Sequence, residues 1–96
     1  MIKSVKVGHL SIPVKYDPDI SPSVMGLFID SPTPKILITK ELKGNQQATQ
    51  TILHESIHAL SHFYQIRLKE KQVLLLDMAM ATFIKDNPKL IKELQK

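Results

Sequence analysis

Hydrophobic and polar residues follow two different spacings along this chain. In roughly the first 40 residues, apolar side chains alternate with polar ones or form short β-branched runs, which predicts strands. Turn-forming residues separate these runs, and the segment 31–34 is expected to turn a hairpin. The expected strands are Val5–Val7, Leu10–Tyr16, Met25–Asp30 and Lys35–Thr39. Helical spacing follows, and strands before helices are typical of an α+β domain.

The second part of the chain predicts two long helices and a short third one. Asn45 precedes the first apolar repeat, where its side chain can accept a hydrogen bond from a free backbone N–H. We therefore expect a helix over residues 46–64 and an antiparallel partner over 69–86. Pro88 suits the first position of the third helix.

The second expected helix is apolar on nearly every face. Between Val73 and Ile84, its only charged side chain is Asp77. A helix with this pattern is expected to be buried. A buried carboxylate is costly unless a cation or several hydrogen-bond donors meet it. The pattern therefore predicts a specific partner for Asp77.

Length and composition limit the classes of protein that the chain can form. Its 96 residues suffice for one domain, and 43% hydrophobic with 23% charged residues is typical of a globular protein. The absence of cysteine excludes disulfides and thiolate metal sites, and it fits the cytoplasm. No apolar run approaches the roughly 18 residues of a membrane span, and the start of the chain lacks a signal core.

The charge of the chain is moderately basic. The net charge is +4, but the 13 Lys and Arg residues are scattered among acidic ones. No basic stripe or aromatic-interleaved patch emerges, so a solvated basic surface is expected and nucleic acid is not expected as a partner.

Two histidines one helical turn apart lie in the first expected helix, in the run His54-Glu55-Ser56-Ile57-His58. Residues i and i+4 share a helix face, so His54 and His58 can bind one ion. Neutral imidazole suits Zn²⁺, which takes nitrogen ligands at about 2.0 to 2.1 Å. The spacing predicts a zinc site, and two merely solvated or hydrogen-bonded histidines are the simpler alternative.

Glu55 is expected beside the ion, where its carboxylate can take a proton from a water molecule. This is the H-E-x-x-H arrangement of zinc-dependent peptidases. The packing residues of the helix fall on a different stripe from the ligands. These packing residues are Ile52, Ser56, Ala59, Leu60 and Phe63.

The segment from Thr51 to Leu60 resembles the longer zincin metallopeptidase signature. That signature has Val or Thr three residues before the first His, uncharged residues flanking and inside the motif, and an apolar residue two after the second His. The runs 68–73 (LKEKQV) and 86–88 (DNP) are similar to a group of very small phage or prophage-type zincin-like proteins. The resemblance covers roughly residues 36–90. It implies a short antiparallel sheet, the motif helix and a second helix that supplies the last protein ligand.

Two carboxylates compete for the place of the third ligand. If the two long helices are antiparallel, Asp77 lies at the depth of the ion, which would be the cation that a buried carboxylate needs. The resemblance favours Glu70, because the similar small proteins carry Glu at this point of an L-x-E-x-x-V run. An acidic residue in a first helical turn also simply favours the helix dipole. We take Asp77 as the third ligand and Glu70 as the alternative.

Two further residues near the motif, His62 and Tyr64, carry side chains that could belong to the site. His62 adds another turn to the series, but on a continuous helix it lies about 12 Å from His54, too far to share an ion. A position beside a ligand or on the surface is therefore expected for His62. Tyr64 could donate its hydroxyl to a developing oxyanion or simply pack at the helix end.

The sequence thus predicts one zincin-like domain over residues 1–96 that acts as a zinc-dependent metallopeptidase on peptide or protein substrates. Glu55 would take the proton of the attacking water and pass it to the departing amine. The strand Ile36–Thr39 is either a plain buried strand or, as the resemblance implies, an edge strand that pairs with substrate. The main alternative is a non-catalytic binding or regulatory module with this fold, a phage-related one included.

Overall fold

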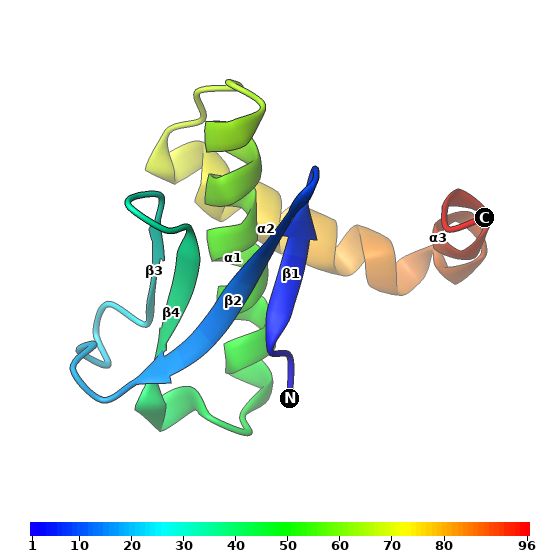
Figure 1. Ribbon diagram of the computed structural model, residues 1–96. Coiled ribbons are helices and arrows are strands. Elements are labelled where there is room, and N and C mark those ends of the chain that lie inside the picture. Colours follow the sequence, from blue (N-terminus) through cyan, green and yellow to red (C-terminus); the bar gives the residue numbers. More distant parts are fainter.

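The protein is an α+β domain in which four strands precede the helices. The computed structural model describes all 96 residues. Figure 1 shows the sheet packed against one long helix, with the last two helices leading away from it. The elements are β1 (Ser4–Val7), β2 (Leu10–Asp17), β3 (Gly26–Ile29), β4 (Lys35–Thr39), a short 3-10 helix (Lys40–Leu42), α1 (Gln46–Phe63), α2 (Glu70–Asp86) and α3 (Pro88–Leu94).

The sheet is mixed, whereas an antiparallel sheet was expected. Its strand order is β1-β2-β4-β3, and β1 and β3 are antiparallel to their neighbours. The central pair, β2 and β4, is parallel, with Val14 opposite Ile36. Parallel neighbours need a crossover connection. Here β3 forms part of that connection, because the chain passes to the outside of the sheet and returns through a hairpin.

The order of the strands decides which of them can pair with another chain. Since β4 lies between β2 and β3, the segment Ile36–Thr39 is a buried interior strand and cannot be the edge strand that the resemblance implied. The free edge on this side of the sheet belongs to β3. This edge strand also contacts α1.

Helix α1 covers one face of the sheet. Its start is fixed as expected, because the Asn45 side chain accepts a hydrogen bond from the Gln47 N–H at 2.8 Å. The helix is continuous over Gln46–Phe63, so it ends one residue before the expected boundary. Its apolar side chains close the core over the strands. The buried core consists of Val7, Ile12, Val14, Ile36, Ile38, Leu42, Ala48, Ile52 and Ala59.

Gly26 allows β3 to lie directly against α1. A Cβ atom at this position would lie 2.7 Å from Thr51 Cγ2 and 3.1 Å from the Leu37 carbonyl oxygen. Those distances leave no room for a side chain, since real Cβ atoms do not approach so closely. Thr51 is buried three residues before the first histidine of the motif. The contact therefore fixes the distance between the edge strand and the histidine-bearing face.

Helix α2 is much more exposed than its apolar sequence predicted. Only Val73 and Asp77 are buried in it, and Leu75 and Phe83 are 58% and 52% exposed. In Figure 1 the second half of α2 leads away from the sheet towards α3, and neither is covered by another layer. The expectation of a fully buried helix was therefore wrong, because α2 packs mainly along α1 and otherwise contacts only the short helix α3 to an appreciable extent. No helix has the length and apolar character needed to cross a membrane.

Candidate metal centre

The two motif histidines lie side by side on α1. Their ring centroids are 5.0 Å apart, as the spacing of one helical turn requires. The His54 side chain is 14% exposed and that of His58 is 26% exposed, so both rings reach the surface of the cleft described below. Both can therefore offer Nε2 to an ion from solvent.

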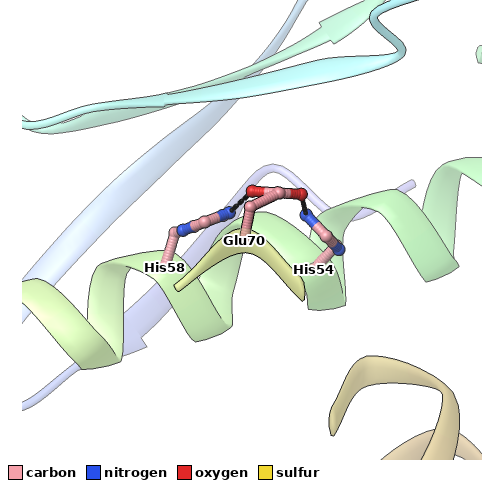
Figure 2. Close-up of side chains that lie close together, drawn as sticks. All are labelled: His54, His58 and Glu70. Carbon is pink, nitrogen blue, oxygen red and sulfur yellow. Dashed lines mark hydrogen bonds and ion pairs between the residues drawn. The ribbon is translucent and has the colours of Figure 1, made fainter. Parts of the chain in front are cut away.

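Glu70, the first residue of α2, lies between the two rings. Its Oε1 is 2.7 Å from His54 Nε2, and its Oε2 is 2.6 Å from His58 Nε2 (Figure 2). One carboxylate thus touches the same nitrogen atom of each ring. The ligand atoms of these three residues all lie within 4.8 Å of one another.

This set of atoms fits a divalent transition metal. Two imidazole nitrogens and one carboxylate are the protein ligands of many catalytic zinc sites. Atoms bound at about 2 Å to one ion must lie within about 4 Å of one another. The present spacing comes close to that limit, and Glu70 is 69% exposed, so its side chain can move enough to admit an ion.

Asp77 does not belong to this set, in contrast to the ligand assignment that we preferred from helix geometry. Its Oδ2 is hydrogen-bonded to Nδ1 of His54, the ring nitrogen that faces away from Glu70. Its Oδ1 accepts a hydrogen bond of 3.3 Å from Gln50 Nε2. The buried carboxylate therefore has donors as partners and orients the His54 ring, which leaves Nε2 free for an ion.

Asp77 lies level with His54 along the two helices, as expected. It meets the His54 ring at Nδ1, however, and not at the Nε2 side where the ion would bind. Asp77 lies opposite His54, as antiparallel helices require, yet it is only 4% exposed and lies between the helices. The longer Glu70 side chain reaches the exposed nitrogens from the start of α2. Helix positions alone give the depth of a residue, whereas the ring atom that it meets depends on how the two helices cross.

The connection between the two helices sets the position of Glu70. Gln65 and Arg67 have positive φ angles of 57° and 65°, which reverse the chain within a few residues. Ser61 holds this turn, because its hydroxyl accepts a 2.8 Å hydrogen bond from the Leu68 N–H. The Lys69 N–H then donates to Gln72 Oε1 at 2.8 Å, which satisfies a free donor at the start of α2.

Glu55 lies beside the histidines in a protected position. It is 6% exposed and lines the cleft. Burial raises the pKa of the Glu55 carboxyl above its ordinary value, although the charges of His54 and His58 and a backbone hydrogen bond from Phe28 act in the opposite direction. A carboxylate with a raised pKa is better suited to accept a proton.

The pKa of His54 is also raised. Burial of the ring is the largest single effect and lowers the pKa, but the hydrogen bond to Asp77, the charge of Glu55 and the contact with Glu70 together outweigh it. The surroundings of His54 thus favour a positive charge at the ring. The same surroundings favour a cation bound to the ring.

His62 and Tyr64 take no part in this cluster. His62 Nε2 lies 3.5 Å from Asp30 Oδ2, and its ring packs against Phe28 and Phe63. Its place further along the cleft agrees with the expectation that a continuous helix keeps it from the ion. The Tyr64 hydroxyl lies beside Gly8 in the turn between β1 and β2, so it is not placed as an oxyanion donor.

The cluster lies in a cleft with a volume of about 1190 Å³. The edge strand β3 and the residues flanking it form one side of this cleft, and α1, the α1–α2 connection and the first half of α2 form the other side. Leu27 and Phe28 of β3 and Leu74 and Met78 of α2 contribute apolar surface. The sequence indicated α1 and α2 as the source of site residues but did not indicate β3.

Gln50 is a further site residue that sequence reasoning missed. It donates to both the carboxylate and the main-chain oxygen of Asp77, at 3.3 and 3.2 Å. Its position four residues before His54, on the same helix face, was a signal that could have identified it.

Comparison with protein-family models, with curated proteins and with solved structures finds no match to this chain.

Proposed function

We propose that the protein is a zinc-dependent metallopeptidase in which His54, His58 and Glu70 hold the ion. One observation carries the proposal: both Nε2 atoms and the Glu70 carboxylate converge in a cleft, with the buried Glu55 beside them. When bound, Zn²⁺ at such a site polarises a scissile carbonyl and lowers the pKa of a water molecule.

The proposed place of action is the cytoplasm, on the basis of the cysteine-free composition.

Glu55 is the general base in this proposal. Its carboxylate takes the proton of the attacking water and then delivers it to the departing amine, so the residue ends the cycle as it began. The raised pKa of Glu55 brings the carboxyl closer to the range in which both transfers are favourable. Its burial keeps bulk water from competing for the proton.

Asp77 and Gln50 act through His54 in this proposal. Asp77 accepts the Nδ1 proton of His54, which fixes the tautomer with a free Nε2. Gln50 donates to Asp77 and so holds its carboxylate in place. Neither residue needs to contact the substrate.

The free edge of β3 is the surface proposed to bind the substrate. An extended peptide added beside β3 would make main-chain hydrogen bonds and lie along the cleft that contains the metal cluster. Peptides and unfolded protein segments are therefore the proposed substrate class. The strand Ile36–Thr39 is excluded from this role, because it is paired on both sides.

Peptide cleavage by the zinc-loaded protein tests the proposal. A mixture of peptides of varied sequence is incubated with the protein, and cleavage is followed by mass spectrometry. Glu55→Gln should retain zinc and lose hydrolysis by about 10²- to 10⁴-fold, the usual contribution of a general base. A chelator should abolish cleavage, and added Zn²⁺ should restore it.

Glu41→Gln is the matched control, because Glu41 is exposed and does not line the cleft. It should leave both zinc binding and hydrolysis unchanged. If Glu55→Gln binds zinc and cleaves as fast as the unsubstituted protein, the catalytic role of Glu55 is wrong. If the zinc-loaded protein cleaves no peptide in the mixture, the site is a metal site without peptidase activity.

A further inference from the structure

The face of α2 that points away from α1 is apolar and unpaired. Leu75, Ala79 and Phe83 follow one another on this face at spacings of four residues, and Leu76 lies three residues before Ala79. Leu75, Leu76 and Phe83 are 58%, 38% and 52% exposed. We call these four residues the α2 stripe. They do not line the metal cleft.

The chain exposes more surface than a compact monomer of its size. Its accessible surface is 7049 Å² at a mass of 10.9 kDa, whereas the usual scaling gives about 5,600 Å² for such a monomer. The excess of roughly 1,450 Å² exceeds the about 800 Å² that one partner contributes to a standard interface. The projecting α2 and α3 in Figure 1 account for the elongated shape. The excess surface of the whole chain is therefore large enough to include a standard dimer interface.

The charges at the ends of the α2 stripe are complementary to each other. Lys71 lies beyond one end and Asp86 beyond the other, and neither forms an ion pair within the chain. Between Gln72 and Ile84 the only charged residue is Asp77, which is buried. The exposed face is thus neutral along its length, with one positive and one negative end.

We propose that the α2 stripe forms a homodimer interface, in which two α2 helices pack antiparallel around a two-fold axis at Ala79. Residues equally far before and after position 79 then face each other, so Leu75 of one copy meets Phe83 of the other. Lys71 of each copy comes close to Asp86 of its partner. The small Ala79 side chain lets the helices approach to the usual axial separation of about 8 to 10 Å.

A second copy fits this surface because the surface is complementary to itself. A two-fold axis brings each residue to its counterpart, so one arrangement covers both stripes and pairs all four end charges. The face offers no charged group at its centre by which a different, charged partner could be selected. The metal clefts remain open, since the α2 stripe lies outside their lining.

The mass in solution tests the dimer directly. Light scattering during gel filtration, from micromolar to near-millimolar protein, should give twice 10.9 kDa. Phe83→Glu should shift the protein to the monomer mass, because it buries an unpaired carboxylate of each copy against Leu75 of the other copy. Ile66→Glu is the matched control, since Ile66 is 55% exposed and lies in the α1–α2 connection. It should remain dimeric.

A charge exchange tests the antiparallel arrangement. Lys71→Asp and Asp86→Lys should each weaken the dimer, because each places like charges opposite one another. The double variant should recover most of the lost affinity. A monomer at all concentrations, or equal weakening by Ile66→Glu and Phe83→Glu, overturns the dimer. A double variant that is weaker than both single variants overturns the antiparallel pairing.

A single cysteine locates the axis. The chain contains no cysteine, so Ala79→Cys introduces the only thiol. If the two helix axes are about 8 to 10 Å apart, the two Cα atoms of residue 79 lie closer together than the axes do, because both face the two-fold axis. Their separation is then close to the Cα–Cα distance of about 4.4 to 6.8 Å that a disulfide spans. Mild oxidation should give a covalent dimer for Ala79→Cys and none for Thr49→Cys, which lies on α1. The absence of the covalent dimer overturns the position of the axis.

Discussion

Asp77 meets His54 on Nδ1, the ring nitrogen opposite to the one that the metal cluster uses. The carboxylate is buried, and Gln50 holds its other oxygen. The sequence indicated Asp77 as a direct ligand, but in the structure it contacts the His54 ring and not the place of the ion. This difference leads to separate expectations for the two carboxylates of α2.

Asp77→Asn should weaken zinc binding without abolishing it. The amide keeps the size of the side chain but removes the negative charge that holds the His54 ring and its Nδ1 proton. Loss of such a supporting partner usually costs about 10- to 100-fold in metal affinity. Competition with a chromophoric chelator measures this change. Asp19→Asn, in an exposed loop, is the control and should bind as the unsubstituted protein does.

Glu70→Ala should reduce zinc binding more than Asp77→Asn does. It removes a side chain that touches both Nε2 atoms, so only two protein ligands remain. Zinc per chain after gel filtration should fall well below one for Glu70→Ala and stay near one for Asp77→Asn. Stoichiometric zinc in Glu70→Ala, together with its loss in Asp77→Asn, would return Asp77 to the role of ligand.

Gly26→Ala should destabilise the protein by about 1 to 3 kcal/mol, the usual cost of overpacking a core. The added Cβ would meet Thr51 Cγ2 at 2.7 Å and force β3 away from α1. Chemical denaturation measures the loss. Thr51→Ser removes the Cγ2 atom, so the double variant should lose less stability than the two single variants summed. Additive losses would show that Thr51 is not the obstacle.

Stability of the metal-free protein should fall as the pH rises from the acidic range. Burial raises the folded-state pKa of Glu55 above 4.5, so the unfolded chain loses this proton first. The pKa of His54 is raised above 6.5, so the stability from its charged form is present below that pH and lost above it. Both groups therefore favour unfolding as the pH rises.

Glu55→Gln separates the contribution of Glu55 to the pH dependence of stability from that of His54. The amide cannot ionise, so this variant should gain stability relative to the unsubstituted protein as the pH rises above about 4.5. Thermal melts in chelator over a series of pH values measure the difference. A constant difference at all pH values would mean that Glu55 keeps its ordinary pKa in the folded protein.

The sequence predicted the local features of this fold well. The four strands and both long helices lie where the hydrophobic spacing placed them, and Asn45 caps α1 through its side chain as expected. The pairing of His54 with His58 also follows from helix geometry alone. Each of these features depends on residues only a few positions apart, so a local pattern is enough to predict them.

Features that depend on distant parts of the chain could not be read from the same patterns. The parallel pairing of β2 with β4 depends on where the chain goes after residue 17, and no local signal records it. The ring atoms that Glu70 and Asp77 meet depend on the crossing of α1 and α2. The apolar sequence of α2 indicated burial, but it could not say whether this chain or a second one provides the cover.

The position of β4 between β2 and β3 limits the order in which the domain can be assembled during synthesis. The first two strands emerge as a hairpin, which is marginally stable by itself. β3 has no neighbour until β4 follows it, because β4 separates it from β2. The sheet therefore becomes complete only when residue 39 is available, and α1, which covers it, is made immediately afterwards. A nascent chain halted before that point exposes an unpaired strand edge, which is where aggregation would begin.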